Sequence, residues 1–326
     1  MLRIVASPAR RLVLLSLCWL LPMPAAAQHG MKCLYVSSYH RGYAWSDGVE
    51  QGLRQLLSPH CDIRQFDMDT KRHKSVQAKR EAALKAKSLI EQWQPDIVIT
   101  ADDNAVRYLL QTYYRDAALP FVFCGVNWTA QEYSLPYRNA TGIIEVAPIR
   151  PLLRQVKSLL GEVKTAVYIG ADTLTEQKNH DRFARMAQKE GIVVERALAA
   201  TRSDWLAAYA RAQQADFVII GSNAGIEDWD SQAVRRHLET VTRKLSVTNH
   251  DWMMPYTMLG FTKIAREQGE LAARVAISIL DGVAPVNIAI VPNRKWDLWS
   301  NLKLMQVAGI RLPERLLRKS KQIHQP

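Results

Sequence analysis

Short apolar runs and amphipathic segments alternate along most of the chain. The first run, residues 33–36, is followed by residues 48–57, in which apolar positions recur at helical spacing. Residues 96–100 and 121–124 are further apolar runs, separated by a helical stretch at residues 104–114. Because apolar runs of this length are typical of strands buried on both faces, the pattern predicts a parallel sheet covered by helices.

Residues 131–140 interrupt this rhythm with a proline, an asparagine and other polar residues, and we place a crossing between two lobes there. The alternation then resumes and continues to Leu245. Its predicted strands are residues 141–146, 166–169, 192–194 and 217–220. Within this second array, Thr173 and Glu176 form a capping-box pattern that predicts the start of a helix. The sequence therefore predicts an α/β protein with two doubly wound parallel-sheet lobes.

The first 27 residues differ in kind from the rest of the chain. Three arginines accompany an apolar run at residues 12–21, which is too short to span a bilayer comfortably, and residues 25–27 are alanines. This pattern predicts a cleavable secretory signal at residues 1–27 and a soluble, periplasmic mature protein. Without these arginines the formal net charge falls by three, from +12 to +9. Because the protein is expected to be exported, we expect no nucleic-acid partner for its basic charge.

The 326 residues suit two domains, and 48% apolar with 23% charged residues is typical of a globular protein. Outside the expected signal the chain keeps three cysteines, and pairing is allowed outside the cytosol. Cys33 and Cys61 each open a predicted strand, and they lie side by side if those strands are parallel neighbours. We expect a Cys33–Cys61 disulfide with Cys124 free; two buried free cysteines are the alternative.

Signatures of catalysis are scarce. The chain has no Gly-x-x-x-x-Gly-Lys phosphate loop, no Gly-x-Ser-x-Gly nucleophile elbow and no histidine pair at metal-ligand spacing, so we expect neither an enzyme nor a cofactor or metal. His40 and His250 leave open a metal or acid–base role if the fold brings them together. Asp102 and Asp103 are open to three interpretations: a catalytic carboxylate pair, acceptors for a ligand, or caps of the following helix, with at least one of them expected to cap it.

Polar and aromatic side chains gather where predicted strands end, in both arrays. The loop at residues 37–48 is the richest of these ends. In open α/β sheets ligands bind beyond the carboxyl ends of the strands, so facing lobes would line a common cleft that closes on a small solute. The predicted ligand-binding residues are Tyr39, His40, Tyr43, Trp45, Asp102, Asp103, Asn127, Glu145, Asp172, Ser222, Asn223 and Trp252, with Trp128 and Asp251 beside them.

Several stretches resemble a known family. They are SYHRGYAWSDG at residues 38–48, FVFCGVN followed by residues 139–143, WMMP at residues 252–255 continuing through LGFTKIAREQGELAARVAISILDG, and residues 301–310. Together they make the chain similar to type I periplasmic binding proteins, and more narrowly to the ABC-transporter substrate-binding family that includes tryptophan- and tyrosine-type binding proteins. The resemblance implies two lobes joined by a three-segment hinge: residues 28–143 with 256–285, and residues 144–255 with 286–326.

The same resemblance implies a protein that delivers a small solute to a membrane permease and its cytoplasmic ATPase. We expect the protein to be a monomer. An amino acid or related compound, including aromatic ones, is the first expectation for the solute, although the many acids near the cleft suit an amine or cation equally well. Two alternatives remain open. One is a ligand-sensing subunit for a membrane sensor kinase or cyclase, and the other is a secreted enzyme that uses His40 with Asp102 or Asp103.

Overall fold

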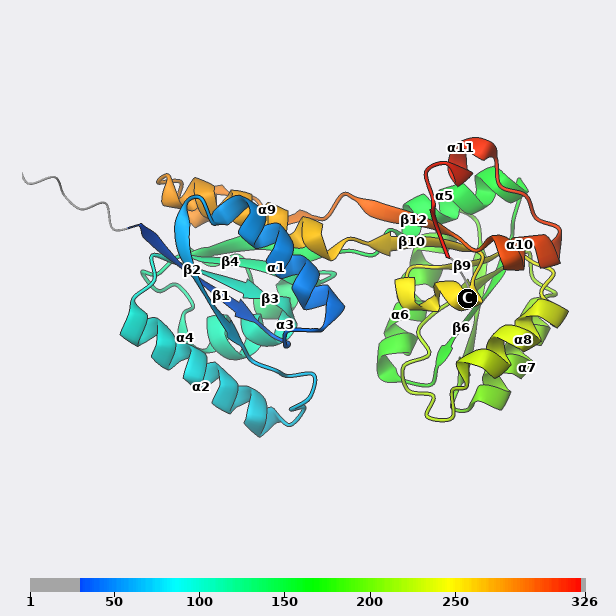
Figure 1. Ribbon diagram of the computed structural model, residues 1–326, viewed down its shortest axis with the longest axis horizontal. Coiled ribbons are helices and arrows are strands. Elements are labelled where there is room, and N and C mark those ends of the chain that lie inside the picture. The colour runs from blue at the N-terminus through cyan, green and yellow to red at the C-terminus, as the bar shows by residue number, and fades with distance from the viewer. Residues whose placement is uncertain (1–29, 324–326) are drawn as a thin grey trace, which may run out of the picture. The chain divides into compact units, whose positions relative to one another are not determined.

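The computed structural model describes residues 30–323 and shows two α/β lobes, each built around its own sheet (Figure 1). The expected signal sequence, residues 1–27, lies outside the described residues. Among the described helices, none is both long and apolar enough to cross a membrane.

The first lobe contains a six-stranded parallel sheet in the order β11-β5-β4-β3-β1-β2. Its strands are β1 (Met31–Ser37), β2 (Cys61–Asp67), β3 (Ile97–Ala101), β4 (Phe121–Asn127), β5 (Ala140–Glu145) and β11 (Val291–Pro292). Its helices are α1 (Ala44–Leu57), α2 (Val76–Trp93), α3 (Asp102–Ala105), α4 (Gln111–Tyr113) and α9 (Ala265–Leu280), with a π-helical turn at Val106–Leu110 and 3-10 turns at Gln131–Tyr133 and Pro285–Asn287.

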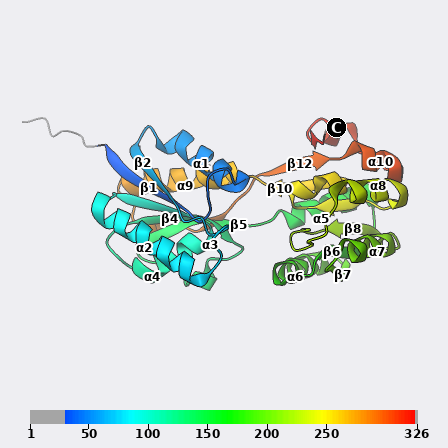
Figure 2. The same ribbon diagram turned by 60° about the horizontal axis from the view of Figure 1, so that its bottom comes forward.

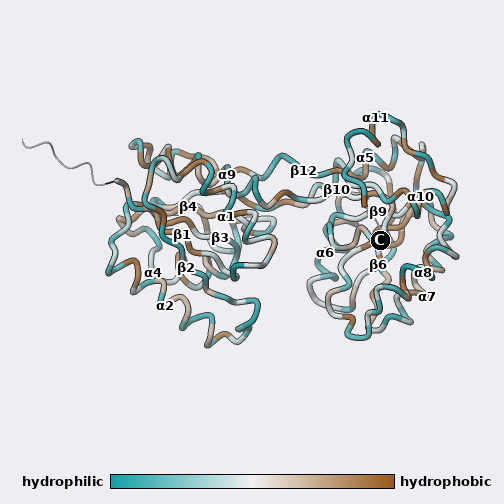
Figure 3. Tube along the Cα trace, viewed as in Figure 1, coloured by the Kyte–Doolittle hydropathy of each residue, from teal (hydrophilic) through white to brown (hydrophobic). Residues whose placement is uncertain are grey.

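Helices cover both faces of the first sheet. Along β1, Cys33 and Tyr35 pack toward α1 and α9, whereas Leu34 and Val36 pack toward α2 and the π-helical turn. All four side chains are fully buried, which explains why the strand appears in the sequence as an unbroken apolar run. Figure 3 shows such apolar stretches running through the sheets, with polar stretches in the outer turns.

The second lobe contains a seven-stranded sheet in the order β13-β12-β10-β9-β8-β6-β7. Its strands are β6 (Thr165–Ala171), β7 (Val193–Ala199), β8 (Phe217–Ile220), β9 (Ser246–Thr248), β10 (Leu259–Lys263), β12 (Trp296–Ser300) and β13 (Lys321–Gln322). Its helices are α5 (Ile149–Leu160), α6 (Leu174–Gln188), α7 (Arg202–Ala212), α8 (Ser231–Val241), α10 (Leu302–Ala308) and α11 (Glu314–Leu317), with a 3-10 turn at Asp251–Tyr256.

Only the β10–β12 pair of the second sheet is antiparallel among the described strands. Helix α5 contacts α6, whereas α7 contacts α8 and α8 contacts α10, so the helices form two groups around the sheet (Figure 2). The prediction of two doubly wound, largely parallel lobes is confirmed.

The chain passes between the sheets three times: after β5, between β10 and α9, and between β11 and β12. Residues 131–140, where we expected a crossing, instead stay in the first lobe, because β5 pairs with β4 and both Tyr133 and Tyr137 are buried in its core. The expected boundaries at residues 143, 255 and 285 each precede the observed change of sheet.

Hydrogen bonds tie the crossing segments to one another. The Asn293 side chain accepts from the Val146 N–H at 2.7 Å, which joins the third crossing to the first. The Glu267 carboxylate accepts from the N–H groups of Arg294 and Lys295 at 2.9 Å each, which joins the third crossing to the start of α9. The hinge is therefore a connected set of segments rather than three independent linkers.

Helix α9 packs against α1 with their backbones in contact, although α9 follows the second lobe in sequence. A Cβ atom at Gly52 would lie 2.0 Å from the Arg266 carbonyl oxygen, and one at Gly269 would lie 2.0 Å from the Val49 carbonyl oxygen. Both positions therefore require glycine, and the pair of glycines fixes how α9 completes the first lobe.

Cys33 and Cys61 form a disulfide between β1 and β2, with their Cα atoms 5.7 Å apart. The two strands are parallel neighbours, and Cys61 lies opposite Met31, two residues before Cys33 on the same face of the sheet. The cysteines are therefore diagonal neighbours. Cys124 is free and buried in β4.

Candidate functional site

Asp103 comes shortly after β3 and Asn127 ends the neighbouring strand β4, so the two meet at the carboxyl edge of the first sheet. The Asp103 carboxylate accepts hydrogen bonds from the Tyr133 hydroxyl at 2.7 Å and from the Asn127 side-chain amide at 2.6 Å. These donors fix the carboxylate at the surface of this edge. The strand-end reasoning thus brings these two residues together as expected.

Asp102 lies beside Asp103 but is buried, with 2% of its surface exposed. Its Oδ1 accepts from the Trp45 indole N–H at 2.9 Å, and its Oδ2 has no hydrogen-bond partner among the described residues. Burial, and then the charge of Glu145, raise the pKa of Asp102 well above its usual value. Its φ of +68° lies in the left-handed region, and a Cβ atom at the adjoining Gly125 would lie 2.8 Å from Oδ1.

Neither aspartate caps the following helix, contrary to expectation. Helix α3 begins at Asp102 itself, two residues earlier than predicted, and its start has no side-chain cap. The Ser38 hydroxyl, from the loop after β1, accepts the Ala105 N–H at 2.8 Å instead. The first helical donors are thus partly satisfied by another strand end, which leaves the Asp103 side chain available to Tyr133 and Asn127.

Lys263 links the two sheets at the hinge. Its ammonium forms an ion pair with the buried carboxylate of Glu145, so the end of β10 is joined to the end of β5. The same ammonium lies 5.3 Å from the centre of the Trp45 ring, within cation–π range. Burial raises the pKa of Glu145, and the charge of Lys263 opposes that shift.

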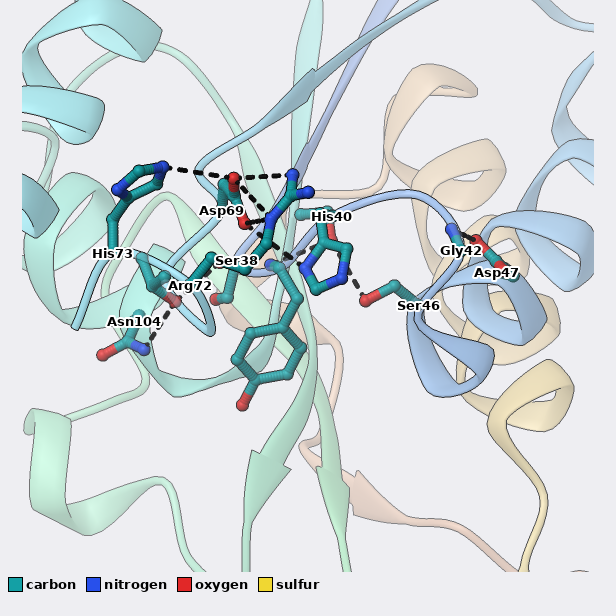
Figure 4. A network of polar contacts seen from close by, with 12 residues as sticks. Ser38, His40, Gly42, Ser46, Asp47, Asp69, Arg72, His73 and Asn104 are labelled. Carbon is teal, nitrogen blue, oxygen red and sulfur yellow. Dashed lines mark hydrogen bonds and ion pairs between the residues drawn. The ribbon is translucent and has the colours of Figure 1, made fainter.

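The loop after β1 is organised around Asp69 (Figure 4). Nδ1 of His40 lies 3.3 Å from Asp69 Oδ1, and the Arg72 guanidinium donates to the same carboxylate at 2.8 Å. The hydrogen bond from Arg72, together with the charges of Arg72 and His40, lowers the pKa of Asp69. His40 therefore contacts Asp69 in the first lobe. Lys71 lies over the rings of Tyr39 and Tyr43, at 4.7 and 4.9 Å from their centres.

The predicted residues of the second lobe lie at strand ends but mostly make local contacts. The Ser222 hydroxyl accepts from the Ala224 N–H at 3.0 Å, and the Asn223 carbonyl accepts from the Ile226 N–H at 3.0 Å. Asp172 is exposed after β6. Trp252 is 53% exposed, and its ring lies 4.4 Å from that of His250.

The predicted capping box is only half formed. The Thr173 hydroxyl accepts the Glu176 N–H at 3.3 Å, but the Glu176 carboxylate accepts from the Tyr168 hydroxyl at 2.7 Å and the Ser222 N–H at 2.8 Å. Glu176 thus links β6 to the turn after β8, and it does not bond to the start of its own helix.

A cavity of ≈350 Å³ lies between the two lobes. Its volume is within the range of small-molecule sites. It is lined by Asp103, Asn104, Arg107, Asn127, Trp128, Glu132, Tyr133, Ala147, Thr175, Lys178, Asn179, Arg182, Asn249, His250 and Lys263. Of the twelve predicted ligand-binding residues, only Asp103 and Asn127 line it.

The walls of this cavity carry opposite charges. Arg107 is paired with Glu132, and Lys263 with Glu145. This leaves Asp103 as the acid of the first-lobe wall, whereas Lys178 and Arg182 on α6 have no acidic partner within ion-pair distance among residues 30–323. The cavity is therefore less acidic than the sequence led us to expect, because Asp102 and Glu145 are buried behind its wall.

His250 and Asn249 leave buried polar atoms without partners on the second-lobe wall. Both ring nitrogens of His250 and the side-chain oxygen of Asn249 lack hydrogen bonds among the described residues, and both residues are more than nine-tenths buried. Burial, with the nearby charge of Lys263, lowers the pKa of His250 to about 3, so its ring is neutral near pH 7. Since buried polar groups are normally paired, these atoms are suited to a ligand in the cavity.

His250 and His40 do not come together as a metal pair, since His40 is held at Asp69 and His250 lines the cavity. Among residues 30–323 no group of three His, Cys, Asp or Glu side chains is placed to hold a metal.

A family model described as "ABC transporter substrate binding protein" matches residues 38–324. A search of curated proteins finds no match. Among solved structures, the chain is similar to an ABC domain from Streptococcus pneumoniae in complex with L-Trp, with 15% identity, a TM-score of 0.61, and coverage of 90% of this chain and 99% of that one.

The chain is also similar to a substrate binding protein with adhesive properties from Clostridium difficile, in its ligand-free, open structure. That match has 11% identity, a TM-score of 0.72, and coverage of 90% of this chain and 99% of that one. A periplasmic ribose ABC transporter from Conexibacter woesei matches with 13% identity, a TM-score of 0.58, and coverage of 90% and 98%. At these identities the similarity shows a shared fold.

Proposed function

Because the chain belongs to the ABC transporter substrate-binding protein family, we propose that it binds a small organic zwitterion, an amino acid or a related compound, in the cavity between its lobes. The family is one of binding proteins that work with a membrane permease and a cytoplasmic ATPase, and it is not a class of enzymes. We further propose that the protein acts in the periplasm as a monomer. A disulfide at Cys33 and Cys61 fits an oxidising compartment.

The bipolar cavity is the observation that carries the proposal. The Asp103 carboxylate, oriented by Tyr133 and Asn127, suits an ammonium group on the first-lobe wall. Lys178 and Arg182 suit a carboxylate on the opposite wall. A zwitterion pairs both walls at once, whereas an amine or a simple carboxylate leaves one of them unpaired.

Aromatic amino acids are the first ligands to test. Trp128 lines the cavity and is only partly buried, and flat rings stack well on such a side chain. The similar structure from Streptococcus pneumoniae was solved with L-Trp.

The experiment is a thermal-shift screen of the purified protein against amino acids, amines, small carboxylates and purines, followed by calorimetric titration. We expect amino acids to raise the melting temperature, because a ligand that binds the native state stabilises it. Asp103→Asn and Arg182→Gln are each expected to weaken binding roughly 10- to 100-fold, since a charge-assisted hydrogen bond contributes about 1.5–3 kcal/mol.

Asp62→Asn is the matched control, because Asp62 is an exposed acid of the same lobe that does not line the cavity. It should bind like the wild type. Wild-type affinity in both cavity variants, or no stabilisation by any amino acid, would refute the proposal.

A further inference from the structure

A second cavity adjoins the first, and the two share Trp128 and Arg182 in their walls. Its volume is ≈590 Å³. It is lined by Trp128, Thr129, Arg150, Arg182, Arg185, Met186, Gln188 and Lys189. A solute in the first cavity therefore has a neighbouring space into which a further group can extend.

The lining of the second cavity contains four cationic side chains and no acidic one. Arg182, Arg185 and Lys189 recur along one side of α6 and its C-terminal end, and Arg150 adds a fourth charge from the first turn of α5. Within residues 30–323, none of the four lies within ion-pair distance of an acid.

The acids around these cations do not neutralise them. Glu132 and Asp103 are the acids whose charges act on Arg182, but neither lies within ion-pair distance of it, and Glu132 is paired with Arg107. Asp181, whose pKa the charge of Arg185 helps to lower, is paired with His180 and Arg196. Burial and the neighbouring charge of Arg185 lower the pKa of Arg182, as expected where like charges gather without a counter-ion.

One side of the cavity is shaped for an organic rather than a purely inorganic occupant. The Arg182 guanidinium carbon lies over the Trp128 ring, 4.6 Å from its centre and within cation–π range. Met186 adds an apolar contact beside them. Guanidinium groups also match the geometry of carboxylate and phosphate oxygens, which they bind through paired N–H groups.

We propose that the second cavity binds an additional anionic group of the solute, a carboxylate, phosphate or sulfonate carried on an apolar body. The inference rests on the proposed function in assigning this group to an amino-acid-like solute. It narrows the solute class to zwitterions that bear a further negative charge.

The first test uses inorganic phosphate, which lacks the ammonium group and the ring of an amino acid and so probes the cationic side chains without them; the double variant below assigns the binding to the second cavity. Calorimetric titration at low ionic strength should show binding to the wild type at millimolar concentration, weakened about tenfold or more in the double variant Arg150→Gln/Arg185→Gln. Added salt should weaken wild-type binding, because exposed charges are screened. Arg274→Gln is the control, since Arg274 is an exposed arginine of α9 outside both cavities; it should bind phosphate like the wild type.

The second test compares L-tyrosine with O-phospho-L-tyrosine, which differ only in the phosphate. The wild type should prefer the phosphorylated compound about tenfold or more, and the double variant should lose that preference. Asp103→Asn should weaken both compounds but should not weaken the binding of inorganic phosphate, because it removes a negative charge that acts on Arg182.

The two proposals fail in different ways. In one outcome, amino acids bind, but phosphate either binds the wild type and the double variant equally or does not bind at about 10 mM. That outcome refutes the anionic site and leaves the proposed function standing. If phosphate binding depends on Arg150 and Arg185 but no amino acid binds, the anionic site stands and the zwitterion assignment is refuted.

Discussion

Replacing Lys263 with methionine should expose how strongly the hinge depends on one ion pair. Lys263 and Glu145 join the ends of β10 and β5, with side-chain exposures of 23% and 6%. Methionine keeps most of the aliphatic length of lysine but removes the charge. The variant thus leaves the Glu145 carboxylate buried without its counter-ion.

The expected loss in the free energy of unfolding is about 3 kcal/mol at pH 7.5. Removing one partner of a buried ion pair costs about 3–5 kcal/mol, and the lower end applies because Lys263 is partly exposed. The lost contact with the Trp45 ring is included in that figure, since such contacts contribute about 0.5–1 kcal/mol. For domains of this size the loss corresponds to a melting temperature lower by roughly 6–12 °C.

The assay is thermal and urea unfolding of the wild type, Lys263→Met, Glu145→Gln and the double variant. Lys85→Met is the control, because Lys85 is exposed on α2 and has no acidic partner within the part of the chain described. A Lys263→Met variant no less stable than Lys85→Met, or a double-mutant cycle without coupling between Lys263 and Glu145, would refute the reasoning.

The loss should also depend on pH. Burial already holds the pKa of Glu145 above its value in the unfolded chain, and removing Lys263 raises it further. A carboxyl group whose pKa is raised in the folded state makes the protein more stable as the pH falls through that pKa, because the folded state binds the proton more tightly than the unfolded state does. The deficit of Lys263→Met is therefore largest at neutral and higher pH and shrinks on acidification.

Two further predictions concern the disulfide and the buried histidine. The double variant Cys33→Ser/Cys61→Ser should lose about 3.5 kcal/mol in the free energy of unfolding, as expected for a cross-link between residues separated by 28 positions. A reductant should lower the melting temperature of the wild type but not of the variant. Equal responses to the reductant would contradict the prediction. The pKa of His250 is lowered to about 3, so below about pH 6.5 this histidine takes up a proton in the unfolded chain but not in the folded protein. The free energy of unfolding of the wild type should therefore fall by about 1.4 kcal/mol for each pH unit as the pH falls from about 6.5 toward 3. Unfolding measured from pH 7 to pH 4 should show a weaker pH dependence in His250→Gln; an unchanged dependence would place the proton elsewhere.

The alternation of apolar runs and amphipathic segments in the sequence could locate the strand ends, and with them part of the site. Asp103 and Asn127 meet because β3 and β4 are neighbours, and both follow apolar runs that are plain in the sequence. The sequence could not show that Asp102 turns inward to Trp45, since both aspartates follow the same strand and only burial separates them.

The cations of the second-lobe wall were missed for a different reason. Lys178 and Arg182 lie on α6, not at a strand end, and polar residues on one side of a helix normally indicate a solvated face. Their role depends on the opposite lobe facing them, which is a tertiary feature. The spacing of Lys178, Arg182, Arg185 and Lys189 along one side of a helix that follows a strand end was the available signal.

The close packing of α9 on α1 has a consequence for the order in which the chain can assemble. Residues 146–263, which supply most of the second sheet, emerge from the ribosome before α9 does. The face of the first sheet that α9 covers must therefore stay open while the second lobe is being made. Contacts between segments so distant in sequence form slowly, so a nascent or translocating chain holds an incomplete first lobe until residues 265–292 arrive.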